Sequence, residues 1–482
     1  MSQQRAQPRP PRPAPTRAVR AATARSIAFE VLRAVSESDA YANLLLPARL
    51  ERAAQSPSGP LSHSDAALAT ELTYGTLRLR GYYDRVIELA AGRPVGRIDD
   101  PVLDALRLGC HQLLTMRTPS HAAVFETVEL VRGSGSRSAV GFANGVLRAV
   151  ARSTPETWMG RVSDSTSGGD DLLAALTSHP AWIVRAMRHA LAAEHREHEL
   201  EALLDADNRA PRVNLAALPG LANRPSDSEL NRYSPIGFVW KGGDPSTIVA
   251  ATDGAIRVQD EGSQLAAQVF LAARDVQQGE LWLDLCSGPG GKAAVLAAAA
   301  KSSGARLVAN ELVPARLELL RRAVAPAASV VELSGRDGTV VGDEEPGRFD
   351  RVLLDAPCTG LGALRRRPEA RWRKTPGDVP ELARLQAALL DSAVKALRPG
   401  GVLCYVTCSP HLAETRVAVS DALKRHPGEL RELPTQDVLQ GLAVEQLDLA
   451  GDPAQVQLWP HRHGTDGMFI VLLEKVGPDT PK

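Results

Sequence analysis

The amino-acid sequence predicts a multidomain protein in which an all-α domain precedes an α/β domain. Apolar residues recur at helical spacing over the first third of the 482-residue chain, whereas strand-like apolar runs alternate with helical segments from about residue 264 onward. The length also exceeds what one hydrophobic core normally supports. With 44% hydrophobic and 23% charged residues, the composition is that of a globular protein and excludes a wholly disordered or collagen-like chain.

Charge and cysteine content narrow the class of protein further. The 56 basic and 56 acidic residues cancel, but a net charge of zero says nothing of local patches and does not exclude nucleic-acid binding. Five cysteines without a C-x-x-C pair fit neither a disulfide framework nor a zinc site, and they suit a reducing cytoplasm. No apolar run approaches the roughly 20 residues that span a bilayer. We therefore expect a cytoplasmic protein with no metal and no membrane partner.

Four regions are expected along the chain. Residues 1–22, rich in proline and arginine, are predicted to be a disordered basic arm, for which weak RNA attraction and no role at all are equally open. Residues 23–155 carry the helical pattern, and Cys110 and His111 within it are interpreted as packing or surface residues. Residues 156–255, with the stretch SDSTSGGDD near their start, are interpreted as a linker and a less regular subdomain. Residues 256–482 form the predicted α/β domain.

Six apolar runs in this last region are predicted strands, namely residues 281–285, 305–310, 329–333, 351–357, 401–407 and 468–475. Helical patterns separate most of them, which favours a doubly wound, mainly parallel sheet with helices on both faces. Ligands of such sheets bind at the carboxyl ends of the strands. The candidate functional residues are therefore those that directly follow each run.

A glycine-rich turn and four acidic residues lie at the ends of the first four runs. The turn Ser287-Gly288-Pro289-Gly290-Gly291-Lys292 allows the backbone to approach a ligand closely, but it matches neither GxGxxG nor GxxxxGK[ST]. Acidic residues stand at the ends of all four runs, namely Asp284, Glu311, Asp337 and Asp355, and a carboxylate after the second strand can accept both hydroxyls of a ribose. The set favours a nucleoside pocket for S-adenosylmethionine over one for ATP or NAD. The alternative is that these carboxylates cap helices in a structural domain.

Two cysteines give a sharper signal. Cys358 follows the fourth run and Cys408 the fifth, so neighbouring strands could bring both thiols to one pocket, whereas Cys404 inside the fifth run is expected to fill space. A thiol whose pKa is lowered is a nucleophile. Methylation of a pyrimidine at C5 needs such a nucleophile, because C5 does not attack a methyl sulfonium until a thiolate adds at C6. A second group must then help to remove the C5 proton and to release the thiolate.

A basic run lies just after Cys358. Its candidate nucleic-acid ligands are Arg365, Arg366, Arg367, Arg371, Trp372, Arg373 and Lys374. Charge runs are commonly solvated faces, and that interpretation stays open. The tryptophan, which could stack on a base, and the position beside the candidate pocket favour contact with nucleic acid.

With these motifs, the chain resembles the RsmB/Sun-type 16S ribosomal RNA (cytosine-C5) methyltransferases of the NOL1/NOP2/Sun group over nearly its whole length. The segments 71–78 (ELTYGTLR), 106–109 (LRLG), 121–124 (HAAV) and 144–148 (NGVLR) look like the NusB-like RNA-binding domain of this branch. The segments 258–264 (VQDEGSQ) and 465–469 (TDGMF) look like the start and the final strand of its catalytic domain. The resemblance implies a NusB-like domain at 23–155, an RNA-recognition subdomain within 156–255 and a Rossmann-like class I methyltransferase domain at 256–482.

The resemblance also implies roles for individual residues. S-adenosylmethionine would be lined by Cys286, Ser287, Gly288, Pro289, Gly290, Gly291 and Lys292, with Glu311 on its ribose, Asp337 near its adenine and Asp355 reaching both cofactor and target base. Cys408 of the Thr-Cys-Ser motif would be the nucleophile, and Cys358 of Asp-Ala-Pro-Cys would assist release of the product. The chain departs from the family pattern at Ser287-Gly288, usually two alanines, and at Pro410 and Thr415, where local loop geometry is affected.

The function that follows is that of a monomeric, cytoplasmic, S-adenosylmethionine-dependent enzyme that makes 5-methylcytosine in 16S rRNA through a cysteine–C6 adduct. Two alternatives stay open. One is a protein of methyltransferase fold that binds RNA or assists ribosome assembly without catalysis. The other is an enzyme that methylates a different substrate, such as tRNA or protein, because fold does not fix substrate.

Overall fold

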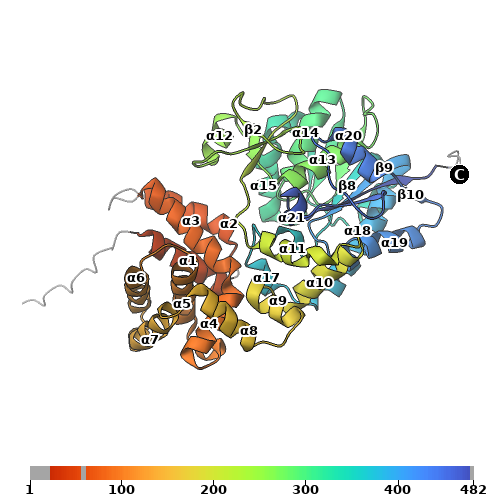
Figure 1. Ribbon diagram of the computed structural model, residues 1–482. Coiled ribbons are helices and arrows are strands. Elements are labelled where there is room, and N and C mark those ends of the chain that lie inside the picture. Colours follow the sequence, from red (N-terminus) through yellow and green to blue (C-terminus); the bar gives the residue numbers. More distant parts are fainter. Residues whose placement is uncertain (1–21, 39, 56–60, 478–482) are drawn as a thin grey trace, which may run out of the picture.

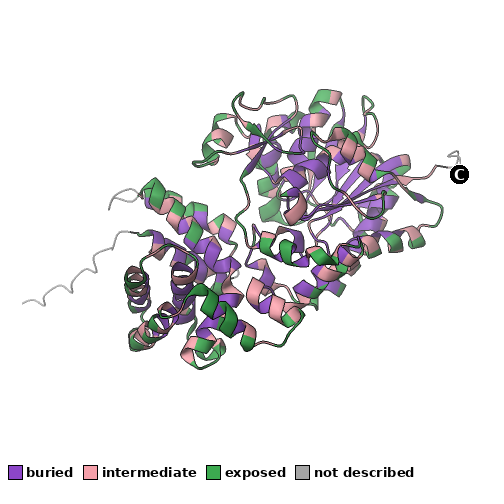
Figure 2. Cartoon of the chain, viewed as in Figure 1, coloured by how far each residue is buried: buried purple, intermediate pink, exposed green. Residues whose placement is uncertain are grey.

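The computed structural model describes residues 22–38, 40–55 and 61–477, and it confirms the predicted order of an all-α domain followed by an α/β domain (Figure 1). The predicted basic arm, residues 1–22, lies outside the described residues except for Ala22. Buried residues gather in the large sheet and on the inner faces of the helices (Figure 2). Each domain has a hydrophobic core of its own, and a group of helices lies between the two domains.

Among the residues that the structure describes, seven α-helices form the N-terminal helical domain: α1 (Ala24–Ser38), α2 (Ala42–Ala54), α3 (His63–Arg78), α4 (Arg80–Ala91), α5 (Asp100–Leu114), α6 (Ser120–Gly133) and α7 (Val140–Ala151). Helix α5 is central, because every residue from 102 to 112 is buried. Cys110 belongs to the hydrophobic core, and Nδ1 of His111 lies 2.9 Å from the hydroxyl oxygen of Tyr83. Their interpretation as packing residues is confirmed.

The expected linker is instead a set of packed helices: α8 (Pro155–Asp164), α9 (Asp170–Thr177), α10 (Ala181–Ala192) and α11 (Leu200–Asp207). The SDSTSGGDD stretch forms only the end of α8, a short turn and the start of α9. Helices α8 and α9 pack on α4. Leu203 of α11 shares a hydrophobic core with Leu361, Leu364 and Trp459 of the α/β domain. These connecting helices therefore join the two domains by packed contacts.

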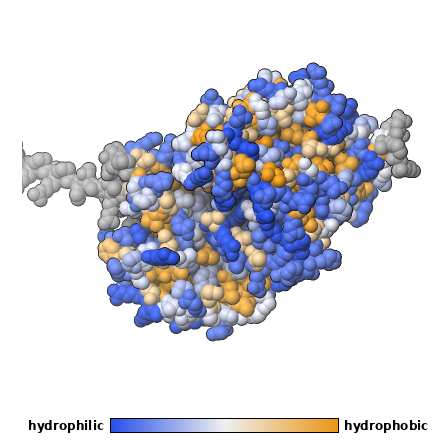
Figure 3. Space-filling model, turned by 45° about the horizontal axis from the view of Figure 1, so that its top comes forward, coloured by the Kyte–Doolittle hydropathy of each residue, from blue (hydrophilic) through white to orange (hydrophobic). Residues whose placement is uncertain are grey.

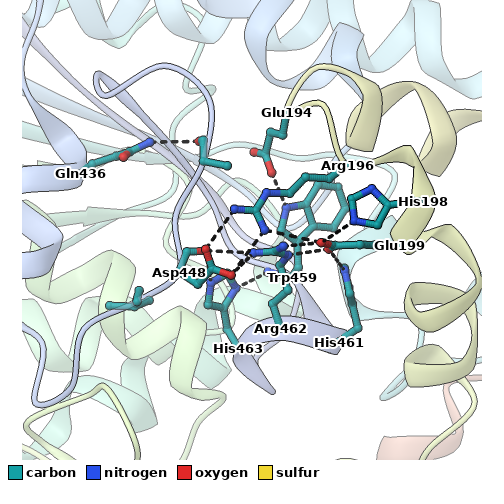
Figure 4. Close-up of polar contacts among 12 residues, drawn as sticks. Glu194, Arg196, His198, Glu199, Gln436, Asp448, Trp459, His461, Arg462 and His463 are labelled. Carbon is teal, nitrogen blue, oxygen red and sulfur yellow. Dashed lines mark hydrogen bonds and ion pairs between the residues drawn. The ribbon is translucent and has the colours of Figure 1, made fainter.

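A polar cluster adds to the contact between the connecting helices and the α/β domain (Figure 4). Arg462, on the short helix α21 (Pro460–His463), forms an ion pair with Glu199, which directly precedes α11. The indole N–H of Trp459 donates to Glu194 at 2.8 Å. Because Trp459 and Glu194 are both buried, this contact is closed to water. Such a closed interface fixes the position of the connecting helices against the α/β domain.

A small antiparallel sheet precedes the α/β domain. Its order is β2-β3-β1-β4, formed by β1 (Asn214–Ala217), β2 (Glu229–Leu230), β3 (Gly237–Val239) and β4 (Ile256–Val258), with α12 (Ser246–Ala251) before β4. Because β4 pairs with β1, the domain boundary predicted at residue 256 cuts through this sheet. The α/β domain begins instead at α13 (Glu261–Ala272), a few residues later.

All six predicted strands occur in one large sheet of order β10-β12-β9-β8-β5-β6-β7, with β11 paired to β12. The strands are β5 (Leu281–Asp284), β6 (Arg306–Asn310), β7 (Val331–Ser334), β8 (Phe349–Asp355), β9 (Leu397–Thr407), β10 (Leu430–Glu432), β11 (Gln455–Gln457) and β12 (Phe469–Lys475). Strands β5 to β9 pair in parallel and β12 is antiparallel to β9, so the sheet is mainly parallel, as predicted. The short strands β10 and β11 were not predicted, because pairing with β12 rather than a local apolar run defines them.

Helices cover both faces of the large sheet, as a doubly wound fold requires. Besides α13 and α21 they are α14 (Gly291–Ser303), α15 (Pro314–Val324), α16 (Val341–Glu344), α17 (Ala370–Arg373), α18 (Asp378–Ala396), α19 (Arg416–Arg425) and α20 (Thr435–Leu442). The chain runs outward from β5 through β6 to β7 and then returns to β8 on the other side of β5. The carboxyl ends of β5 and β8 therefore flank the crevice in which such folds bind ligands.

Arg371, on the short helix α17, joins all three parts of the molecule. Its buried guanidinium donates to the backbone carbonyl oxygen of Arg78 in the helical domain at 2.9 Å. It also donates to the carbonyl oxygens of Ser178 and Asp207 in the connecting helices, at 3.1 and 2.8 Å. One side chain of the α/β domain thus satisfies backbone acceptors of both other parts.

Replacing this guanidinium is expected to destabilise the whole assembly. In Arg371→Leu the buried acceptors lose their donor, which should lower the free energy of unfolding by about 3 kcal/mol. Arg367→Ala, at an exposed position of the same segment, should change it by less than about 0.5 kcal/mol. Urea denaturation followed by circular dichroism measures both values. An Arg371→Leu protein that unfolds at the same urea concentration as Arg367→Ala would contradict this role.

Candidate active site

A glycine turn follows β5 and leads into α14. Gly290 has a φ of +106°, which side chains rarely allow, and a Cβ there would lie 2.4 Å from the Cβ of Ala323. A Cβ on Gly288 would lie 2.1 Å from Oε2 of Glu311. Because Gly290 requires glycine and Gly288 carries no side chain, the backbone at the start of α14 is free of side chains that would keep a ligand away.

Glu311 supports this turn from the end of β6. Its Oε2 accepts from the backbone N–H of Gly288 at 3.1 Å, and its Oε1 accepts from the N–H of Val313 at 2.8 Å. A guanidinium nitrogen of Arg316 lies 3.4 Å from Oε2. An alanine at position 288, usual in the family that the sequence resembles, would push against this carboxylate. Glycine in place of the usual alanine at position 288 thus leaves room for the carboxylate of Glu311.

Three charged residues lie together at the carboxyl ends of β5 and β8 and the start of α14. Nζ of Lys292 donates to Oδ2 of Asp355 at 2.9 Å. Although burial disfavours a charged lysine, the attraction of Asp355 raises the pKa of Lys292. Burial, together with repulsion from Asp355, raises the pKa of Asp284 to about 8. Ser287 and the backbone N–H of Cys286 lie close enough to favour the charged form of Asp284, but neither of its carboxylate oxygens makes a well-formed hydrogen bond to a described residue.

Asp284 is therefore a buried polar group that is available to bind a ligand. Buried polar atoms are nearly always hydrogen-bonded, so an orphaned carboxylate at a ligand crevice indicates a binding site. From the sequence, Asp284 counts only as one of the acidic groups at the strand ends, with no role of its own. Its position at the end of the first predicted strand, just before the glycine turn, was the signal for such a role.

Cys358 and Cys408 meet, because the parallel pairing of β8 and β9 places the loops after them side by side. Their sulfur atoms are 3.5 Å apart. The hydrogen bond donated by the Cys358 thiol lowers the pKa of Cys408, against the opposing effects of burial and Asp355, and Lys292 adds to the lowering. The same hydrogen bond, with burial, raises the pKa of Cys358. Cys408 is thus the more acidic thiol of the pair and Cys358 the less acidic one.

Glu414 holds the two cysteine loops together. This fully buried carboxylate accepts from the backbone N–H of Thr359 at 2.7 Å and also from the Thr359 hydroxyl. The same hydroxyl lies 3.2 Å from the hydroxyl of Ser409. Since Thr359 directly follows Cys358 and Ser409 directly follows Cys408, these bonds set the separation of the thiols. Neither Glu414 nor Thr359 could be assigned to the site from the sequence, because their pairing is visible only in three dimensions.

A second contact between the loops is made by backbone alone. The N–H of Gly362 donates to the carbonyl oxygen of Cys408 at 2.9 Å, and the N–H of Gly467 donates to the carbonyl oxygen of Gly362 at 2.7 Å. A Cβ on Gly362 would lie 1.9 Å from the carbonyl oxygen of Gly467. The segment before β12 therefore supports the cysteine pair through a contact that only glycine allows.

The remaining predicted pocket residues differ in exposure. Asp337 is exposed and accepts from the N–H and the hydroxyl of Thr339 in its own turn, at 2.9 and 2.8 Å. Cys286 is partly buried at the start of the glycine turn, and Cys404 is fully buried in β9, as a space-filling residue should be. The structure thus gathers the glycine turn, Asp355 and the cysteine pair at the carboxyl ends of neighbouring strands and leaves Asp337 on the exposed turn after β7.

The basic run after Cys358 does not form one open RNA-facing surface, which corrects the sequence-based interpretation. Arg365 and Arg366 both form ion pairs with Asp260 and Asp466. Arg371 is fully buried in the contact described above. Their charges are therefore matched within the protein, by carboxylates that stand about a hundred residues away in the sequence.

The end of the run is also used for contacts between domains. The ring of Trp372 fills the space beside Gly81, where a Cβ would lie 2.3 Å from it. The guanidinium of Arg373 donates to the carbonyl oxygens of Val35, at 3.3 Å, and Ala40, at 2.6 Å. Arg367 is exposed and Lys374 is partly exposed. These two basic side chains are the members of the run that remain accessible to a nucleic acid.

All five cysteines carry free thiols, so Cys358 and Cys408 are not held in a disulfide. No group of three or more histidine, cysteine, aspartate or glutamate side chains in the described part of the chain is arranged to hold a metal ion. No helix among residues 22–38, 40–55 and 61–477 is long and apolar enough to span a membrane.

Fold and site together define a Rossmann-like methyltransferase, with a glycine turn after β5, a carboxylate after β6 and a final antiparallel strand. The chain matches the family described as 16S rRNA methyltransferase RsmB/F over residues 271–474. It matches the NusB family over residues 22–152.

Relatives match over nearly the full length. "Putative methyltransferase Rv1407" of Mycobacterium tuberculosis is 47% identical over 460 residues, which cover 94% of this chain and 96% of the relative. "Ribosomal RNA small subunit methyltransferase B" of Pseudomonas putida is 31% identical over 466 residues, with coverage of 94% and 98%. The crystal structure of PH0851 has the same fold, with a TM-score of 0.76 at 23% identity and coverage of 94% and 98%. The chain belongs to the RsmB/F family of 16S rRNA methyltransferases and carries a NusB-family domain at its N-terminus.

The hydrogen bond between the thiols predicts the pH dependence of alkylation. Only the thiolate reacts with iodoacetamide, so Cys408 should react at lower pH than Cys358. In Cys358→Ala the donated hydrogen bond is lost, the pKa of Cys408 should rise, and its alkylation at neutral pH should slow about tenfold for each pKa unit gained. Cys286→Ala removes a thiol that does not donate to Cys408 and should leave the profile unchanged. Mass spectrometry of the alkylated peptides gives the rates, and an unchanged Cys408 profile in Cys358→Ala would contradict the assignment.

Proposed function

We propose that the protein transfers a methyl group from S-adenosylmethionine to C5 of a cytosine in 16S rRNA through a covalent bond between Cys408 and C6. The observation that carries this proposal is the pair of thiols 3.5 Å apart, one with a lowered and one with a raised pKa, beside Asp355. Chemistry at C5 needs these two functions, a nucleophile at C6 and a second group for the elimination.

The residues of the crevice suit S-adenosylmethionine. Glu311 stands where a carboxylate can accept ribose hydroxyls, and the glycine turn leaves room for the methionine part. The orphaned carboxylate of Asp284 fits an ammonium group such as the amino group of methionine. When bound, this cofactor supplies an electrophilic methyl group. Cys286, Asp337 and the side chain of Lys292 complete the proposed binding set.

Cys408 begins the proposed reaction by adding its thiolate to C6, which moves the electron pair of the C5–C6 double bond toward C5. Asp355 can accept a hydrogen bond from the exocyclic amine of the cytosine, or from N3 once N3 carries a proton, and thus hold the base while the charge develops. The electron pair at C5 would then bond to the methyl group, and the electron pair of the broken carbon–sulfur bond would stay on the sulfur of the cofactor. Lys292, which donates to Asp355 at 2.9 Å, holds that carboxylate in place.

Cys358 completes the proposed reaction. Once Cys408 is bonded to C6 its negative charge is gone, and with it the largest of the effects that raise the pKa of Cys358, while those of burial and Glu414 remain. Cys358 can then lose its proton to water and take the proton from C5. The C5–C6 double bond re-forms, the C6–S bond breaks, and its electron pair returns to Cys408 as a thiolate. Release of the product therefore depends on Cys358, whereas formation of the adduct depends on Cys408.

The choice of 16S rRNA rests on the relatives, whose names describe ribosomal RNA small subunit methyltransferases. Arg367 and Lys374 are the proposed RNA contacts beside the cysteine pair, because they are the accessible members of the basic run. Retention of both cysteines and of the glycine turn argues against a non-catalytic assembly protein. Action on tRNA stays an alternative, because the proposed active-site residues contact a single cytosine and not the rest of the RNA. The enzyme class, the location in the cytoplasm and the monomeric state are also part of this proposal.

Single cysteine variants test the two roles. Incubated with target RNA and S-adenosylmethionine, Cys358→Ala should accumulate a covalent protein–RNA complex on a denaturing gel, because elimination is impaired. Cys408→Ala should form none and should lose activity by at least about a thousandfold. Cys404→Ala, a buried thiol outside the pair, should behave as the wild type. A complex that persists in Cys408→Ala and vanishes in Cys358→Ala would reverse the assignment.

The substrate can be tested in cells. Bisulfite sequencing of ribosomal RNA from a strain lacking the gene should show the loss of one or more 5-methylcytosines in 16S rRNA, restored by the wild-type gene and not by Cys408→Ala. Loss of the modification in tRNA with 16S rRNA unchanged would favour the alternative substrate.

A further inference from the structure

The cysteine pair, Cys358 and Cys408, has the proximity that a disulfide bond requires. The two sulfur atoms are 3.5 Å apart, within hydrogen-bonding distance, although the residues stand fifty positions apart in the sequence. A disulfide joins sulfur atoms at about 2.05 Å, so the sulfurs would have to approach each other by about 1.5 Å. Rotation of the two side chains about their Cα–Cβ bonds gives movements of this size.

The contacts around the pair keep the two cysteine loops from moving apart. The fully buried carboxylate of Glu414 accepts from the backbone N–H of Thr359 at 2.7 Å and from its hydroxyl. The hydroxyl of Thr359 lies 3.2 Å from that of Ser409. Because Thr359 and Ser409 directly follow the two cysteines, the loops stay in contact when the cysteine side chains rotate. A disulfide can therefore form without a change of fold.

The five cysteines differ in how readily an oxidant attacks them. Cys408 is partly exposed, and the contact with Cys358 lowers its pKa despite burial, with a further contribution from Lys292. Side chains of the helical domain, at the lower left of Figure 3, enclose Cys110 in the core of that domain. Because the thiolate is the form that attacks a peroxide, Cys408 should be oxidised first. Burial raises the pKa of the three cysteines outside the pair, Cys110, Cys286 and Cys404.

We propose that the cysteine pair is also a site of reversible oxidation, at which a peroxide converts the two thiols into a disulfide and thereby stops methyl transfer. The oxidation depends only on the two thiols and their contact. Its effect on activity rests on the proposed function, because a disulfide removes both the nucleophile and the group that completes the elimination. A dithiol that reduces the bond would restore the activity.

The proposed oxidation has two steps. The Cys408 thiolate first attacks one oxygen of hydrogen peroxide, the O–O bond breaks, and the hydroxide that leaves takes the proton that the thiol had released. The sulfur, oxidised by two electrons, is now a sulfenic acid. The sulfur of Cys358 then attacks that of Cys408, the S–O bond breaks, and the thiol proton of Cys358 leaves with the oxygen as water. Two thiols and one peroxide thus give one disulfide and two molecules of water.

Cys358 also protects Cys408 in this scheme. A sulfenic acid that no thiol attacks reacts with more peroxide to give sulfinic and sulfonic acids, which thiols do not reduce. Cys358 lies in contact with Cys408 and converts the sulfenic acid into a reducible disulfide before this happens. Removal of Cys358 should therefore turn a reversible oxidation of Cys408 into an irreversible one.

Mass spectrometry of the peroxide-treated full chain tests the oxidation site. The protein is reduced, freed of reductant, treated with hydrogen peroxide at neutral pH and alkylated with iodoacetamide before digestion. The wild type should yield two peptides joined through Cys358 and Cys408, which dithiothreitol separates. Cys404→Ala, the matched control, should yield the same joined peptides. In Cys358→Ala, Cys408 should instead be recovered as a sulfinic or sulfonic acid that dithiothreitol does not reduce.

Methyl transfer by the wild type should fall in proportion to the fraction of joined peptides and return after treatment with dithiothreitol. Free thiols at both positions after peroxide treatment, or disulfides that join other cysteines instead, would overturn the proposal. Circular dichroism before and after treatment checks that the bond forms in the folded protein, and a joined pair found only in unfolded protein would also overturn it.

The oxidation site and the proposed function fail separately. If the joined peptides form and the reduced wild type methylates no RNA, the proposed function fails and the oxidation site stands. If the reduced wild type methylates RNA and peroxide leaves both thiols free, the oxidation site fails alone. A fully oxidised protein that still methylates would overturn both, because the reaction would then not depend on Cys408.

Discussion

The close approach of two loops, one after β8 and one after β9, is the constraint on which the site depends. Parallel pairing brings the loops together, but it does not by itself set the distance between two sulfur atoms. The buried carboxylate of Glu414 and the backbone contact between Gly362 and Gly467 do so. At 3.5 Å the two sulfur atoms are within hydrogen-bonding distance, and this contact lowers the pKa of Cys408 while, together with burial, it raises that of Cys358. Geometry thus makes one thiol of the pair more acidic than the other.

The segment that follows Cys358 links this chemistry to the rest of the molecule. Between the cysteine loop and α18, the chain forms ion pairs around Asp260 and Asp466, inserts Arg371 between the three parts and places Trp372 against the helical domain. The NusB-family domain is therefore attached to the α/β domain through residues next to the active site. RNA bound to the helical domain would be held in a fixed orientation relative to the cysteine pair.

Much of this organisation could be predicted from the sequence. The alternation of apolar runs and helical patterns indicated the large sheet. Because parallel strands end at one edge of a sheet, the residues that follow them predicted where the site lies and which two cysteines belong to it. The basic run was misinterpreted, because a local pattern shows charge and not the carboxylates and carbonyl groups that neutralise it. Arg365 looks like a ligand for phosphate until Asp260 and Asp466 are seen beside it. Glu414 could not be recognised for the same reason, because its partner Thr359 lies on the loop after another strand. Strand β4 could not be recognised either, because it pairs with β1, which lies much earlier in the sequence.

The central claim is that Cys408 and not Cys358 bonds to the target cytosine. The most direct test is tandem mass spectrometry of the Cys358→Ala protein after reaction with target RNA, digestion by nuclease and protease, and isolation of the nucleotide-linked peptide. The account predicts a methylated cytidine nucleotide attached to the sulfur of Cys408. A nucleotide attached to any other residue would contradict this assignment. So would attachment of the nucleotide to the wild-type protein that requires Cys358.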